Sequence, residues 1–150
     1  MHVCASGWPK NATWHREHVK MIVLLDHDLE GQVPFLEAGL RETGWDQYLH
    51  LEFIRLRDLN MPDNTTDQEI WRYVQCEHCL LLTNNRNRED ETSLQATIER
   101  ENTRDSLPVI TVSDKDKLVI PAYRQQAAHK LAELVIYLEN YLGVGRVFIP

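Results

Sequence analysis

The stretch Met21-Ile22-Val23-Leu24-Leu25-Asp26-His27-Asp28 decides the fold. Five apolar residues, two of them β-branched, are followed at once by two carboxylates, as in a buried parallel strand that ends at an open sheet edge. In open α/β sheets the ligand binds beyond the carboxyl ends of the strands. Carboxylates held side by side at that edge repel each other unless a cation or a proton lies between them. The stretch therefore predicts an α/β fold with a metal site at the edge of its sheet.

The composition is that of one soluble globular domain. The chain has 150 residues, of which 43% are hydrophobic and 26% charged. No apolar run approaches the roughly 20 residues that span a bilayer, and residues 5–20 contain no apolar segment of a signal peptide. The three cysteines are an odd number, which argues against a disulfide framework and fits a reducing compartment. We therefore expect a cytoplasmic protein without membrane contact.

The charge is unevenly distributed along the chain. The net charge is −7, but residues 1–20 hold three basic residues and one acidic residue (+2), whereas residues 21–150 hold 13 basic and 22 acidic residues (−9). Residues 1–20 also lack periodicity, and they are interpreted as a loosely ordered extension or as the product of a start site placed too far upstream. The domain itself is predicted to span residues 21–150. An acidic domain can still bind nucleic acid through a local basic patch.

Strand and helix patterns alternate from residue 21 onward. The spacing of apolar residues predicts strands over 22–25, 49–56, 79–83, 107–112 and 146–149, and helices over 33–41, 67–75, 90–104 and 121–142. Thr66 and Glu69 have the spacing of a capping box at the start of the second helix, and Gly44 follows the first helix as a stop. This alternation predicts a single three-layer α/β domain with a mainly parallel five-stranded sheet and helices on both faces.

Acidic residues gather at three points that a parallel sheet brings to one edge. Asp26 and Asp28 end the first strand, Asp67 begins the second helix, and residues 83–90 follow the third strand. Several oxygen ligands converging at such an edge are what Mg²⁺ or Mn²⁺ requires. A metal ion held there can activate water and stabilise the charge that develops in phosphodiester cleavage.

The order of these motifs resembles the PIN-like domain family, and most closely its small ribonuclease toxins. The resemblance covers residues 21–150 and rests on Asp26 and Asp28, on Thr66-Asp67-Gln68-Glu69-Ile70 and on Leu80-Leu81-Leu82-Thr83. It implies a PIN-like fold and an endoribonuclease that uses Mg²⁺ or Mn²⁺ to hydrolyse RNA. It also implies an antitoxin protein as a partner.

The segment after the third strand departs from the family pattern. The family has Thr-x-Asp-x-Asp-Phe there, whereas this chain has Thr83-Asn84-Asn85-Arg86-Asn87-Arg88. Because an amide ligates a metal ion without contributing charge, metal affinity should fall, and Asp90 is expected to supply the missing carboxylate. The predicted catalytic residues are Asp26, Asp28, Asp67 and Asp90, and the predicted metal ligands are Asp26, Asp67, Asp90 and Asn85. The predicted substrate contacts are Arg86 and Arg88, whose guanidinium groups suit phosphate, together with Asn87 and Thr83.

Two other functions stay open. The asparagines favour a PIN-like module that binds RNA or protein without cleaving it. The stretch Asp58-Leu59-Asn60-Met61-Pro62-Asp63 resembles the phosphoacceptor segment of a response-regulator receiver domain, although the strand over 79–83 is one too many for that pattern. Convergence of Asp67 and Asp90 on Asp26 would favour the nuclease. The helix over 121–142 offers Tyr137 and Tyr141 as a homodimer face, with burial inside the monomer as the alternative.

Overall fold

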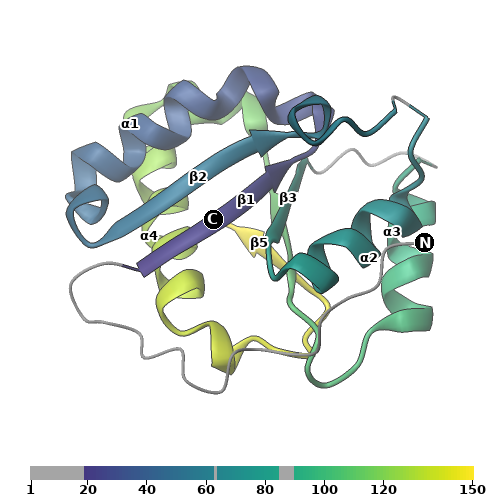
Figure 1. Cartoon of the computed structure of the whole chain (residues 1–150). Helices are drawn as coiled ribbons and strands as arrows, with labels where there is room; N and C mark the ends of the chain where they lie inside the picture. The colour runs from purple at the N-terminus through teal and green to yellow at the C-terminus, as the bar shows by residue number, and fades with distance from the viewer. Residues whose placement is uncertain (1–18, 63, 85–89) are drawn as a thin grey trace.

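A five-stranded parallel sheet forms the centre of the molecule (Figure 1). The computed structural model describes residues 19–62, 64–84 and 90–150, the side chains of 90–92 excepted. The sheet has the order β2-β1-β3-β4-β5, and all of its strand pairs are parallel. Its strands are β1 (Val19–Leu25), β2 (Leu49–Arg55), β3 (Leu80–Asn84), β4 (Val109–Val112) and β5 (Arg146–Ile149). The predicted parallel five-stranded sheet is therefore confirmed.

Helices cover both faces of the sheet and enclose two hydrophobic cores. The helices are α1 (Val33–Thr43), α2 (Asp67–Glu77), α3 (Asp90–Glu101) and α4 (Pro121–Ile136). Alternate residues of β1 separate the cores: Val23 and Leu25 pack with α1 and α4, whereas Leu24 packs with α2 and α3. This pattern is expected of a strand buried on both faces, and the predicted three-layer α/β domain is confirmed.

Gly39 lets α1 and α4 approach closely. A Cβ atom on Gly39 would lie 2.7 Å from the backbone oxygen of Arg124 in α4, which is closer than any ordinary contact. Three residues further along α1, the Glu42 carboxylate forms a two-pronged ion pair with the Arg124 guanidinium. The contact between these two helices therefore depends on glycine at position 39, which has no side chain, and on the ion pair between Glu42 and Arg124.

Several element boundaries differ from the sequence prediction, and the start of β1 and the end of α4 are two of them. β1 begins at Val19, so Val19 and Lys20 pair with Leu49 and His50 instead of belonging to an N-terminal extension. The last helix ends at Ile136 and not at 142, because Tyr137 leaves the helical conformation (φ −110°, ψ 37°). A 3₁₀ turn, η5 (Leu138–Asn140), follows and places Leu138 in the core.

Short 3₁₀ helices follow three of the strands directly or within two residues. η1 (His27–Gln32) follows β1, η3 (Leu56–Leu59) follows β2, and η4 (Lys115–Val119) follows β4, whereas η2 (Trp45–Gln47) lies at the opposite edge before β2. Leu29 in η1 and Leu118 in η4 are both fully buried and anchor their turns in the core beside α1 and α4. These turns form the surface of the carboxyl edge.

None of the described helices is at once long enough and apolar enough to cross a membrane.

Candidate functional site at the carboxyl edge of the sheet

The sheet order places its switch point between β1 and β3. From β1 the chain leads to β2 on one side, and it then crosses back to β3 on the other side. In doubly wound sheets of this order, ligands bind in the crevice beyond the carboxyl ends of these two strands. Asp26 is the first residue beyond β1, and its backbone N–H donates a hydrogen bond of 2.9 Å to the carbonyl oxygen of Leu82 in β3. Asp26 therefore lies at the switch point.

Asp26 also fixes the start of η1. Its carbonyl oxygen accepts a hydrogen bond of 2.9 Å from the Leu29 N–H, and its side chain is half-buried. Asp28 follows within η1 and is exposed. His27 does not follow the alternation of the strand, because the strand has already ended at Leu25. The His27 side chain is 84% exposed, and its Nδ1 lies 3.7 Å from Glu30.

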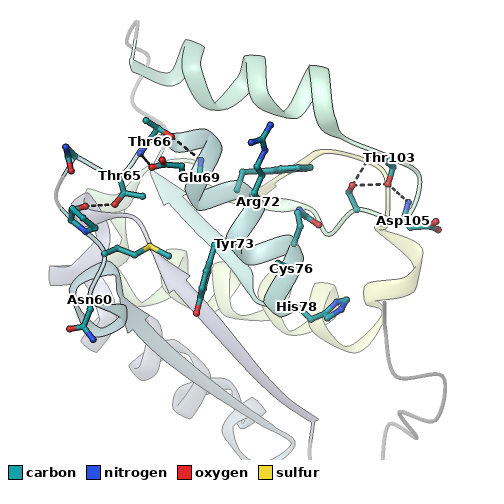
Figure 2. A pocket seen from close by; sticks show the side chains of 16 residues that line it. Asn60, Thr65, Thr66, Glu69, Arg72, Tyr73, Cys76, His78, Thr103 and Asp105 are labelled. Carbon is teal, nitrogen blue, oxygen red and sulfur yellow. Dashed lines mark hydrogen bonds between the residues drawn. The ribbon is translucent and has the colours of Figure 1, made fainter. Parts of the chain in front are cut away.

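Asp67 reaches the same edge from α2. The helix leads from the carboxyl end of β2 to the amino end of β3, so its first residue lies at the carboxyl edge. The predicted capping box is confirmed: the Glu69 N–H donates to Thr66 Oγ1 (3.2 Å), and the Thr66 N–H donates to Glu69 Oε2 (2.9 Å) (Figure 2). The Asp67 side chain is half-buried.

The end of β3 is polar and buried. Thr83 is 2% exposed, and its hydroxyl shares a hydrogen bond of 2.9 Å with the hydroxyl of Thr111 in β4. Arg146 in β5 donates to the same Thr111 oxygen at 3.0 Å. Thr83, predicted as a substrate contact, is thus buried and bonded to β4 in this structure, and its contact with a substrate stays a prediction. Asn84 is 9% exposed and is the last residue of β3, one residue beyond the predicted strand end.

Several of the predicted site residues lie outside the described part of the chain. This applies to Asn85, Arg86, Asn87 and Arg88 and to the side chain of Asp90, although Asp90 begins α3 as expected. Their roles stay predictions.

The metal site also stays a prediction. In residues 19–62, 64–84 and 90–150, no three His, Cys, Asp or Glu side chains form a group that could hold a metal ion. The carboxylate oxygens of Asp26 and Asp67 are ligands of the type that Mg²⁺ and Mn²⁺ prefer. The predicted set is complete only with Asp90 and Asn85.

Two cations beside η1 were missed by the sequence analysis. Arg57 in η3 places its Nη2 atom 3.5 Å from the Glu30 carboxylate of η1. Lys115 in η4 donates from its Nζ to the carbonyl oxygen of Asp28 at 3.3 Å. Both residues come shortly after the carboxyl end of a strand, as Asp26 does. Their place after a predicted strand is the sequence signal that could have identified them.

Asp58, the candidate phosphoacceptor, is held by Arg55. Its two carboxylate oxygens accept hydrogen bonds from the Arg55 guanidinium at 2.9 and 3.1 Å, and one of them also accepts the Arg55 backbone N–H at 3.0 Å. The guanidinium lowers the pKa of the Asp58 carboxyl. Asp58 follows the edge strand β2, so it lies one strand away from Asp26. With both oxygens engaged by an arginine, this carboxylate is poorly placed to accept a phosphoryl group.

A pocket of about 1250 Å³ runs along α2, with Thr66 and Glu69 beside Asp67 among its lining residues (Figure 2). Its wall consists of the turn before α2, the outer surface of the helix and the segment around Thr103 and Ser106. Arg72 and Tyr73 project from α2 in opposite directions, and Arg72 is paired with Glu101 at 2.7 Å. Neither Asp26 nor Asp28 lines this pocket, and we assign it no role.

Comparison of the chain with models of known families, with curated proteins and with solved structures gave no match.

Proposed function

We propose that this protein is a metal-dependent ribonuclease whose site lies at the carboxyl ends of β1 and β3. The observation that carries the proposal is the position of Asp26, which is tied to β3 by its backbone at the switch point of the sheet. Asp28 follows on η1, and Asp67 begins α2 on the same edge. The resemblance of these motifs to the PIN-like family supports RNA as the substrate and an antitoxin protein as a partner.

Each predicted residue then has a distinct role. Asp26, Asp67, Asp90 and Asn85 would hold Mg²⁺ or Mn²⁺, and Asp28 would complete the acidic shell directly or through water. The bound ion supplies activation of water and stabilisation of the charge that develops on the phosphate. The hydrogen bonds of the Asp26 backbone fix the main chain that carries its carboxylate, and a site of this kind requires such support. Arg86 and Arg88 would hold the phosphate chain.

The test is cleavage of several RNAs by the purified protein in Mg²⁺ and in Mn²⁺. We expect cleavage by the wild type and a loss of about 100-fold or more in Asp26→Asn, because one carboxylate with a central electrostatic role is removed. Asp46→Asn is the matched control, since Asp46 is exposed in η2 at the opposite edge of the sheet. It should cleave like the wild type.

Two other outcomes would overturn the proposal. Equal cleavage by the wild type and Asp26→Asn would place the activity in another site or in a contaminant. Absence of cleavage across all RNAs and both metal ions would favour the module that binds without cleaving. The amides Asn85 and Asn87, where the family has carboxylates, already point in that direction.

A further inference from the structure

We propose that Arg57 and Lys115 hold a single RNA strand across the site, one on each side of η1. The phosphate chain would cross the sheet edge from the β2 side toward the β4 side and pass over Asp26 and Asp28. This inference rests on the proposed function, since it assumes that RNA is the ligand of this edge.

Arg57 provides the cation on the β2 side. It belongs to η3, which follows β2, and its side chain is 64% exposed. One guanidinium nitrogen lies 3.5 Å from Glu30, a residue of η1 that is only 19% exposed. This contact directs the guanidinium toward η1. Because arginine has five N–H donors in a fork, donors remain for a phosphate after Glu30 is engaged.

Lys115 provides the cation on the β4 side. It is half-buried at the start of η4, and its ammonium group donates to the backbone carbonyl of Asp28. That contact places a positive charge directly beside the loop that carries the two aspartates. Lysine has three donors, so two N–H groups remain for a phosphate.

The spacing of the strands sets the separation of the two turns that carry the cations. Strands β2 and β4 are separated by β1 and β3, which makes three inter-strand steps of about 4.8 Å, or about 14 Å in all. The acidic residues lie between the two cations, and carboxylates alone would repel a phosphate chain. Cations on both flanks offset this repulsion. Because they lie in one row along the edge, they suit one backbone.

The experiment measures RNA binding without cleavage. A short 5′-labelled oligouridylate is titrated with the protein in EDTA at several salt concentrations, and fluorescence anisotropy gives the affinity. We expect Arg57→Gln and Lys115→Gln each to lose one phosphate contact. Such a loss makes the negative slope of log affinity against log salt shallower by about 0.7. It also lowers the affinity about fivefold at 0.1 M salt. Arg41→Gln is the control, because Arg41 is exposed in the last turn of α1 at the opposite edge.

A variant that keeps the charge separates binding from folding. Lys115→Gln also removes the contact with the Asp28 carbonyl, and could loosen η1 for that reason alone. Lys115→Arg retains a cation and should restore the salt slope of the wild type. Thermal unfolding of all variants checks that they are folded.

The outcomes distinguish this inference from the proposed function. Unchanged affinity and slope in both variants, an equal loss in Arg41→Gln, or no binding by the wild type would overturn the inference. If Asp26→Asn abolishes cleavage while Arg57→Gln and Lys115→Gln bind normally, the nuclease stands and the inference fails. If both variants weaken binding while the wild type never cleaves, the edge binds RNA and the nuclease fails.

Discussion

At the scale of single residues, the hydroxyl of Thr66 caps the start of α2. Thr66 accepts the Glu69 N–H, and Glu69 accepts the Thr66 N–H in return, so two backbone donors of the first turn are satisfied. Asp67, a predicted site residue, comes directly after this cap. The cap therefore contributes to the stability of the helix and to the position of a carboxylate at the sheet edge.

Removing this hydroxyl should destabilise the protein. We expect Thr66→Ala to lower the free energy of unfolding by about 1 kcal/mol, the usual effect of losing an N-cap oxygen. Thr66→Ser keeps the oxygen and should stay close to the wild type. Urea denaturation followed by circular dichroism measures both variants. An equal loss in the two would show that the hydroxyl does not stabilise the helix.

Local patterns could be predicted from the sequence, whereas contacts between turns could not. The capping box and the position of Asp26 at the end of β1 could both be predicted, because each depends on residues that are neighbours along the chain. Arg57 and Lys115 were missed, because their proximity to η1 depends on which strands are neighbours in the sheet. Thr83 was expected at a substrate, but strand pairing turns its hydroxyl toward Thr111.

At the scale of elements, the close packing of α1 against α4 depends on Gly39. Gly39 lies in the middle of α1, where glycine is ordinarily unfavourable, yet the backbone of α4 leaves no room for a Cβ atom. A larger residue would have to push the helices apart. The core that they enclose with the sheet contains residues of both helices and of all five strands.

We therefore expect Gly39→Ala to be destabilising in spite of the better helix propensity of alanine. Overpacking costs about 1–3 kcal/mol, and the gain in propensity is about 1 kcal/mol, so the net loss should be about 1 kcal/mol and at most about 2 kcal/mol. Gly31→Ala is the matched control, because nothing lies within 4 Å of its Cβ position. Differential scanning calorimetry should give a lower Tm for the first variant only. A Tm equal to that of the wild type in Gly39→Ala would show that the helices adjust freely.

The long elements could be predicted and the short ones could not. Apart from the end of α4, the four helices and five strands lie within three residues of their predicted ranges, because apolar periodicity extends over each of them. The 3₁₀ turns at the carboxyl edge contain four to six residues, which is too few for a periodic pattern. The end of α4 was also missed, since Leu138 continues the apolar pattern after the helix has stopped.

The strand order determines, at the scale of the whole molecule, which residues form the candidate site. Alternation of strands and helices predicted a parallel sheet but did not specify that β1 lies between β2 and β3. That order depends on crossovers between distant segments, about which local sequence carries little information. The same order occurs in folds with different activities, so the sheet locates the site and leaves its chemistry to the residues there.

Acid should weaken the whole fold through three carboxylates that are paired with arginine. Hydrogen bonds from Arg124, Arg55 and Arg72 lower the pKa values of Glu42, Asp58 and Glu101, respectively. A carboxyl whose pKa is lower in the folded state stabilises the protein above its unfolded pKa. The ordinary values are 4.5 for Glu and 3.8 for Asp. The contribution disappears as the pH falls through the lowered folded value.

The expected result is a free energy of unfolding that is nearly constant above these ordinary values and falls below them. Urea denaturation over a pH series measures it. Glu42→Gln should be less stable than the wild type at neutral pH, and the difference should shrink in acid. Glu37→Gln, an exposed position on the same helix, is the control and should follow the wild-type curve. A constant difference between Glu42→Gln and the wild type at every pH would contradict the linkage.

The buried leucines of the edge turns bear on how this protein can evolve. Leu29 and Leu118 each fasten a turn to the core, while the neighbouring positions of η1 and η4 are largely exposed. The fold and the chemistry of this edge can therefore change independently. Exposed positions of an anchored turn can be substituted without removing side chains from the core. A lineage that keeps the two leucines can exchange the charged residues around them and acquire a new ligand on an unchanged scaffold.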